Sequence, residues 1–239
     1  MDPRSNKFSS NFVSGVTMRE IDLRAQIEFC VLSVKLMENA GHAVFEFLVS
    51  NSENIQKEKI LIIAGKGNNA GDGFVVARLL LEIMPYGSVD VAVHSGLTLK
   101  EGDAKNNFDL LKNKRFDFLS IEELNKQIIL DNKYTYIIDA VFGTGFRGEL
   151  PNSISNIFEF LNKLEHIKRV AIDIPSGLDS NTGIPAENTF KADHTITFGF
   201  PKNGFQSSPG KNCCGEIHLA DIGFPEKLLN QYLIPNPKI

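Results

Sequence analysis

Polar residues and glycines gather at four places along the chain, each directly after a short apolar segment. The four stretches are GKGNNAGDG (65–73), DAVFGTGFRG (139–148), DIPSG (173–177) and FGFPKNG (198–204). Carboxylates, amides and hydroxyls in such positions bind cations or transfer protons, and glycines let a backbone approach a phosphate. We therefore expect one ligand-binding crevice assembled from segments that are far apart in the sequence.

The first stretch fits a nucleotide-binding turn, with one flaw. Gly65, Gly67 and Ala70 match the pattern G-x-G-x-x-G/A between a predicted strand and a predicted helix, whose N-terminus favours an anion. However, the next predicted strand ends in VAVHSG, without the acidic residue that binds ribose in dinucleotide-binding folds, and Asp72 places a carboxylate in the loop. A tight turn capped by Asp72 is therefore an alternative interpretation.

A second glycine pattern follows another predicted strand. Gly143, Gly145 and Gly148 again form G-x-G-x-x-G, and two such stretches at neighbouring strand ends can line the same crevice. Arg147 lies within the second stretch and can pair with a phosphate through its guanidinium group. A solvated loop arginine is the alternative.

Two charged residues mark the remaining strand ends. Asp173 follows the apolar run RVAI, and a carboxyl group at the rim of a crevice can act as a general acid or base. Its alternative role is to cap a loop by accepting hydrogen bonds from backbone amides. Lys202 lies near the same rim, with a surface lysine as the alternative.

Three further oxygen-bearing side chains follow three different predicted strands. Asn69, Asp139 and Ser176 offer an amide, a carboxylate and a hydroxyl, all hard donors that suit a hard cation and not zinc. Because only one of the three is anionic, a monovalent cation is compatible with this set.

The elements that must position these residues alternate between strand and helix. Nearly continuous apolar runs rich in β-branched residues predict strands covered on both faces, at 59–65, 88–95, 134–143, 169–177, 194–200 and 216–223. Apolar residues at three- and four-residue spacing predict helices in two blocks within 18–49 and at 73–84, 101–113, 121–129 and 153–165. The alternation predicts an α/β fold: a three-layer, Rossmann-like, mostly parallel sheet with helices on both faces. Ligands bind such sheets at the carboxyl ends of the strands.

The chain reads as one domain over residues 13–230, with a disordered leader at 1–12 and a C-terminal tail at 231–239. The net charge of −4 and the dispersed basic residues argue against binding nucleic acid through bulk electrostatics. No apolar run approaches the roughly 20 residues that span a bilayer, so we expect no membrane insertion.

The three cysteines point to a reducing compartment. Cys30, Cys213 and Cys214 form neither a disulfide framework nor a metal-finger spacing, and we interpret the adjacent pair as reduced thiols. We expect a cytoplasmic location, with the mitochondrion as the alternative.

Several separated motifs together resemble the NAD(P)H-hydrate epimerase family, also called the YjeF N-terminal domain family. The motifs are LMENAG (36–41), GKGNNAGDG (65–73), DAVFGTGFRG (139–148), IDIPSGLD (172–179) and TFGFPKNG (197–204), and the resemblance covers about residues 14–225. It implies an isomerase that interconverts the R and S forms of NADH and NADPH hydrated at C6 of the nicotinamide ring. It also implies a functional partner, the ATP- or ADP-dependent dehydratase that accepts only the S form, and a homodimer.

The resemblance also implies roles for individual residues. Potassium is expected to be bound by Asn69, Asp139 and Ser176. The damaged nucleotide is expected to be contacted by Asn68, Asn69, Ala70, Gly71 and Asp72, by Gly143, Thr144, Gly145, Phe146, Arg147 and Gly148, and by Asp173. Our hypothesis for the chemistry is that Asp173 is the catalytic acid–base group.

Two other functional classes compete with this interpretation. The same fold occurs in enhancer-of-decapping proteins, as a dimerisation scaffold associated with RNA that is expected to have lost the epimerase residues. An ordinary NAD-dependent dehydrogenase would explain the glycine patterns but not the missing ribose-binding acid. Asn69, Asp72, Asp139, Asp173 and Ser176 are all present in this acidic chain, which favours the epimerase.

Overall fold

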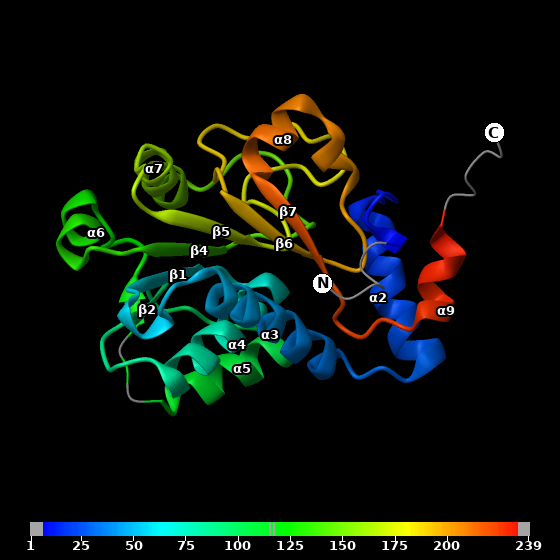
Figure 1. Cartoon of the computed structure of the whole chain (residues 1–239), viewed down its shortest axis with the longest axis horizontal. Coiled ribbons are helices and arrows are strands. Elements are labelled where there is room, and N and C mark those ends of the chain that lie inside the picture. Colours follow the sequence, from blue (N-terminus) through cyan, green and yellow to red (C-terminus); the bar gives the residue numbers. More distant parts are fainter. Residues whose placement is uncertain (1–6, 115, 117, 234–239) are drawn as a thin grey trace.

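A seven-stranded sheet forms the centre of the molecule. The computed structural model describes residues 7–114, 116 and 118–233. Within them the strand order is β3-β2-β1-β4-β5-β6-β7, and every neighbouring pair runs parallel (Figure 1). The strands are β1 (Ile60–Ala64), β2 (Val89–Val93), β3 (Phe118–Ser120), β4 (Tyr136–Ala140), β5 (Lys168–Ile172), β6 (His194–Phe198) and β7 (Glu216–Ala220). The predicted fold class is therefore confirmed.

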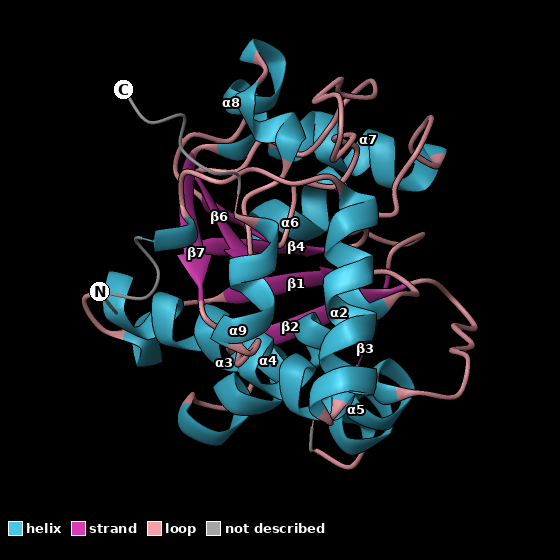
Figure 2. Cartoon of the chain, turned by 90° about the vertical axis from the view of Figure 1, so that its right-hand side faces the viewer, coloured by secondary structure: helices cyan, strands magenta, loops and turns pink. Residues whose placement is uncertain are grey.

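Helices cover both faces of this sheet, as Figures 1 and 2 show. The described helices are α2 (Gly15–Phe29), α3 (Ser33–Asn51), α4 (Asn68–Ile83), α5 (Asp103–Lys112), α6 (Lys126–Asn132), α7 (Asn152–Leu161), α8 (Ser208–Cys214) and α9 (Glu226–Leu229). α3, α4 and α5 lie on one face, and α6 and α7 lie on the other.

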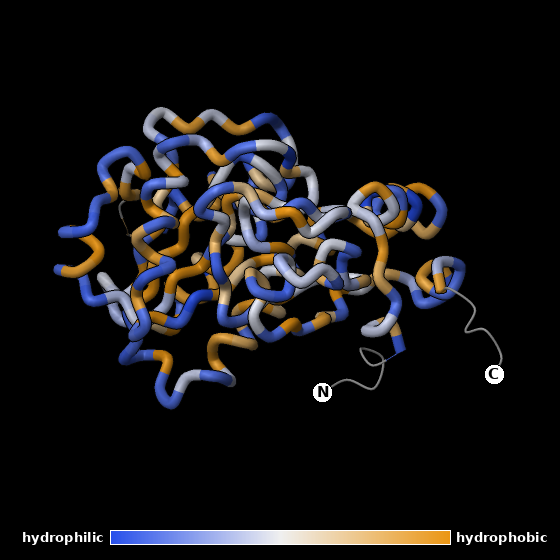
Figure 3. The backbone as a smooth tube through the Cα atoms, turned by 90° about the horizontal axis from the view of Figure 1, so that it is seen from above, coloured by the Kyte–Doolittle hydropathy of each residue, from blue (hydrophilic) through white to orange (hydrophobic). Residues whose placement is uncertain are grey.

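The side chains of β1 explain why its sequence is apolar throughout. Ile60, Ile62 and Ala64 belong to the core beneath α3 and α4, whereas Leu61 and Ile63 belong to the core beneath α6 and α7. All five are fully buried, as expected of a central strand covered on both sides. Seen from above, the apolar stretches run through the middle of the fold and the hydrophilic ones gather around it (Figure 3).

The predicted elements agree with the structure except at short or glycine-rich segments. The helix predicted from residue 73 begins at Asn68, and the one predicted at 121–129 is α6, shifted towards the C-terminus. β3, α8 and α9 have only three, seven and four residues, too few for a periodic apolar pattern to show.

The chain ends partly pack onto the domain. Of the leader predicted to be disordered, residues 1–6 lie outside the described residues, but Phe8 is buried and its ring lies 5.4 Å from that of Phe200. Asn11 also donates a hydrogen bond to the backbone oxygen of Tyr232, in the predicted tail. Among the residues that the structure describes, no helix has the length and apolar character needed to cross a membrane.

Candidate active site

The carboxyl ends of four strands open into one cavity of about 950 Å³. Its wall includes residues 65–69 after β1, 141–147 after β4, Asp173 after β5 and Lys202 after β6. The strand order reverses between β1 and β4, the point at which open α/β sheets bind ligands. α2 stands across these strand ends and completes the wall (Figure 2).

The first glycine-rich stretch forms the start of a helix and not a long loop. α4 begins at Asn68, and its N-cap, Gly67, makes no side-chain capping bond. Asp72 therefore lies within the helix, so the alternative of a turn capped by Asp72 is wrong. A Cβ atom at Gly65 would lie 2.1 Å from the backbone oxygen of Val141, so only glycine permits β1 and β4 to end this close together. Gly67, Asn68 and Asn69 at this helix N-terminus line the cavity, and a helix N-terminus favours an anion.

Not every predicted contact residue lines the cavity. Asn68, Asn69 and Asp72 do so, as do residues 143–147 and Asp173. The side chain of Ala70 instead belongs to the main core, and the α-carbon of Gly71 faces Met37. Gly148 is not part of the wall either; it turns the chain with a φ of 83°.

The predicted cation ligands meet behind the cavity wall. Ser176 donates from Oγ to the Asp139 carboxylate at 2.6 Å and from its backbone N–H to the other carboxylate oxygen at 2.7 Å. The Phe142 backbone joins them, because its N–H donates to Ser176 Oγ at 2.8 Å and its oxygen accepts from Asn69 Nδ2 at 3.1 Å. Three strand ends are thereby tied together.

This cluster brings several hard oxygen donors close together. Asn69 Oδ1 is buried and accepts no hydrogen bond, one of only two such side-chain polar atoms among the described residues. Asp139 is fully buried without a cationic partner, and this burial raises the pKa of its carboxyl to about 6 despite the hydrogen bonds from Ser176. An amide oxygen, a carboxylate and a backbone oxygen fit a weakly charged hard cation.

Asp173 has an unusual backbone and a buried cationic partner. Its φ of 63° lies in the left-handed region, which few non-glycine residues adopt. Lys202 Nζ donates to Asp173 Oδ1 at 2.5 Å, and also to Thr197 Oγ1 and the Phe198 oxygen. Only 1% of the Lys202 side chain is exposed, so the alternative of a surface lysine is wrong. The buried ammonium group therefore forms a close ion pair with Asp173 at the cavity.

Asp72 lines the same cavity, and its carboxyl group has a raised pKa. Its pKa is raised well above the usual value, first by burial and then by the negative charges of Asp173 and Asp22. Burial and the nearby charge of Asp103 raise the pKa of Asp22 in turn. The cavity thus combines a buried carboxyl group whose pKa is raised with a carboxylate paired to lysine, and two carboxyl groups in such different environments are typical of acid–base catalysis.

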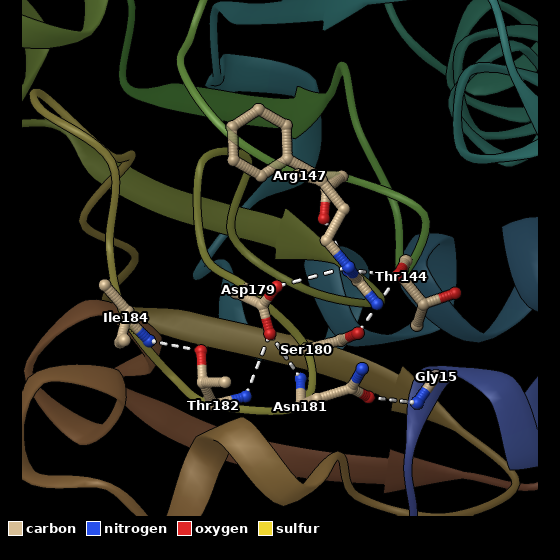
Figure 4. A network of polar contacts seen from close by, with 9 residues as sticks. Gly15, Thr144, Arg147, Asp179, Ser180, Asn181, Thr182 and Ile184 are labelled. Atoms are coloured by element: carbon tan, nitrogen blue, oxygen red, sulfur yellow. Dashed lines mark hydrogen bonds and ion pairs between the residues drawn. The ribbon is translucent and has the colours of Figure 1, made fainter.

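The second glycine stretch forms a rim bound to the loop after β5 (Figure 4). Arg147 Nε lies 3.3 Å from Asp179 Oδ2, and the Arg147 guanidinium donates to the Thr144 oxygen at 3.2 Å. Ser180 Oγ donates to the same oxygen at 3.0 Å. Arg147 therefore has an anionic partner within the chain, and its side chain is still 43% exposed at the cavity rim.

The wall residues that sequence analysis did not single out include Asp22, Asp103 and His94. Asp22 belongs to α2 and Asp103 is the first residue of α5, and tertiary packing brings both to the cavity. His94 directly follows β2, so applying the strand-end rule to that strand would have found it.

Comparisons with known proteins agree with this geometry. The chain is 36% identical to an NAD(P)H-hydrate epimerase of Elusimicrobium minutum, covering 92% of this chain and 98% of that protein, and 33% identical to one of Rhodopirellula baltica, covering 91% and 86%. It is also 35% identical to a bifunctional NAD(P)H-hydrate repair enzyme of Moorella thermoacetica, of which it spans 41% while 91% of this chain is covered. The crystal structure of the yeast protein ynu0 superimposes with a TM-score of 0.75 at 25% identity, covering 92% of this chain and 93% of that one. The family model described as "YjeF-related protein N-terminus" matches residues 33–204, and the chain belongs to this family.

Proposed function

We propose that the protein is an NAD(P)H-hydrate epimerase, which interconverts the R and S forms of NADH and NADPH hydrated at C6. The relatives named above supply the reaction, and one observation supports it in this chain: the lysine-paired Asp173 and the buried Asp72, whose pKa is raised, line the same cavity. The scaffold alternative does not require such a pair, and no relative described above bears a scaffold name.

The substrate is a carbinolamine, because its hydroxyl-bearing carbon is bonded to the ring nitrogen. In our mechanism Asp72 gives its proton to the hydroxyl, the C6–O bond breaks, and the nitrogen lone pair forms a planar iminium as water leaves. Water then adds to either face of C6 and gives a proton to the Asp173 carboxylate, and exchange through cavity water restores the proton on Asp72. General acid–base assistance of this kind contributes about 10²–10⁴-fold.

The wall offers groups for the remainder of the nucleotide. The N-terminus of α4 at Asn68 presents backbone N–H groups to an anion, which suits the pyrophosphate. Residues 143–147 line the adjoining wall, and Arg147 can turn from Asp179 to a phosphate. This arrangement needs no acidic residue at the end of β2.

A potassium ion fits the cluster behind the wall. Asn69, Asp139, Ser176 and the Phe142 oxygen would hold it, and the unpartnered Asn69 Oδ1 supports this assignment. The bound ion would supply positive charge to the buried Asp139 and rigidity to the strand ends that carry the nucleotide-binding segments.

Potassium is expected to stabilise the protein through Asn69. Thermal unfolding is measured in potassium chloride and in choline chloride of equal ionic strength, and linkage gives about 2.7 kcal/mol of stabilisation at a hundredfold excess over Kd. An Asn69→Ala variant is expected to lose this difference, because it lacks the oxygen that has no other partner. An equal response to potassium in wild type and variant would rule out this ligand set.

The epimerase activity is tested with R-NADHX and a dehydratase specific for the S form. We expect the protein to allow complete recovery of NADH from the R form, whereas a scaffold would leave it unconsumed. A dehydrogenase would instead change the absorbance of intact NAD with a second substrate.

A dehydratase is the expected functional partner of this protein. The chain spans about two-fifths of the Moorella relative named as a bifunctional repair enzyme, so repair in that protein involves a segment beyond the matched region. The dehydratase would consume the S form that the epimerase produces.

The protein is further proposed to form a homodimer through α2. Val16, Leu23 and Ile27 recur at spacings of seven and four residues on one helix face and are 57%, 55% and 70% exposed. Leu32, which follows the end of α2 by three residues, is also 68% exposed. A second copy presenting the same face would bury these apolar side chains.

Sedimentation equilibrium is expected to give about twice the chain mass of 26.5 kDa. The double variant Leu23→Asp, Ile27→Asp should sediment as a monomer, because burying the two introduced carboxylates in an apolar interface costs more free energy than the interface supplies. Leu110→Asp serves as the control, since this leucine is 51% exposed on α5 and should leave the dimer intact. A monomeric wild type would contradict the assignment.

A further inference from the structure

Two histidines and a glutamate form a cluster at the edge of the sheet, away from the cavity. His194 is the first residue of β6 and pairs in register with Glu216, the first residue of the edge strand β7. His218 follows Glu216 by two residues and therefore projects from the same face of β7. None of the three lines the cavity at the opposite ends of the strands.

The ligand atoms of this cluster form a small triangle. His194 Nδ1 lies 3.1 Å from His218 Nε2, and Glu216 Oε2 lies 3.6 Å and 3.8 Å from these two nitrogens. Ligand atoms around a tetrahedral zinc ion with bonds of about 2.0–2.1 Å are separated by about 3.3 Å. The three distances lie close to this spacing.

Direct hydrogen bonding accounts for only part of the arrangement. One bond can join the two imidazoles, but the carboxylate stands beyond hydrogen-bonding distance from both nitrogens. Phe47 of α3 packs against both imidazole rings, with centroids at 5.1 Å from His194 and 4.8 Å from His218. These ring contacts support both imidazoles from the same side.

We propose that His194, Glu216 and His218 bind a divalent transition-metal ion of the zinc type. Two imidazoles and one carboxylate match the borderline-soft preference of such ions and disfavour calcium and magnesium. Glu216 is 66% exposed, so solvent reaches the site and can supply the fourth ligand. The ion would link the edge strand β7 to β6 and stabilise the sheet at its open edge.

Calorimetric titration of the chelator-treated full chain with zinc chloride tests the proposal. We expect saturable binding of one zinc per chain and a rise in the unfolding temperature. Glu216→Gln, a change at an exposed side chain, should weaken binding at least about tenfold, and His218→Ala should abolish it. His166→Ala, an exposed histidine outside the cluster, is the matched control and should bind as wild type does.

Zinc binding that is unchanged in both cluster variants would overturn the proposal. So would the absence of saturable binding, or a loss of binding in Asp72→Asn in place of the cluster variants, which would place the ion in the cavity. Circular dichroism of each metal-free variant shows whether it is folded, and Glu216→Gln decides the question if His218→Ala does not fold.

Discussion

Asp173→Asn is expected to lower kcat about 10²–10⁴-fold while leaving nucleotide binding close to that of wild type. The carboxamide keeps the shape of the side chain and can still accept a hydrogen bond from Lys202, but it cannot take a proton from water. Asparagine is also among the residues that best tolerate the left-handed backbone found at this position, with its φ of 63°. The buried Lys202 ammonium loses its anionic partner in this variant, so the free energy of unfolding should fall as well. Circular dichroism and thermal unfolding show that the kinetics are measured on folded protein.

The matched control is Asp193→Asn. Asp193 forms an ion pair with Arg169 at 2.9 Å next to the same sheet but does not line the cavity. Its replacement removes an aspartate–cation pair without touching the proposed chemistry, so kcat should stay near the wild-type value. Kinetics of the coupled epimerase assay and direct titration with the nucleotide measure the two effects separately. Turnover by Asp173→Asn equal to that of wild type would exclude Asp173 as the acid–base group.

The strand-end rule located most of the site from the sequence because a parallel sheet brings all its carboxyl ends to one edge. Asn69, Asp139 and Ser176 were placed together on this basis, and the structure brings them into one hydrogen-bonded cluster. The rule needs only that each strand be recognised, and the continuous apolar runs made the six longer strands recognisable.

Features that depend on neighbours in space were not predictable in this way. The sequence does not show that α2 crosses the strand ends and brings Asp22 to the cavity, because apolar periodicity fixes the buried face of a helix but not what lies beyond it. The burial of Lys202 follows from its partner Asp173, 29 residues earlier. The His194–His218 contact requires that β6 and β7 be adjacent and in a particular register.

The variant Asp72→Asn is expected to be less active but more stable than the wild type. Because the pKa of Asp72 is raised in the folded protein, the folded state binds its proton more tightly than the unfolded chain does. The free energy of unfolding of the wild type therefore falls as the pH rises from 3.8, the usual pKa of aspartate, towards the raised pKa of Asp72. The asparagine of Asp72→Asn carries no charge, so this fall should be absent. Urea unfolding should therefore show that the variant is more stable than the wild type at neutral pH and equally stable under acidic conditions.

The same change should lower kcat about 10²-fold or more, because the amide cannot protonate the departing hydroxyl. In the wild type, activity should fall as the pH rises through the raised pKa of Asp72, and this alkaline limb should be absent from the residual activity of Asp72→Asn. Asp22→Asn provides an independent check. Its charge helps to raise the pKa of Asp72, so removing it should move the alkaline limb to lower pH. An alkaline limb that neither substitution alters would show that another group donates the proton. The assignment of Asp72 as the acid and Asp173 as the base would then be wrong.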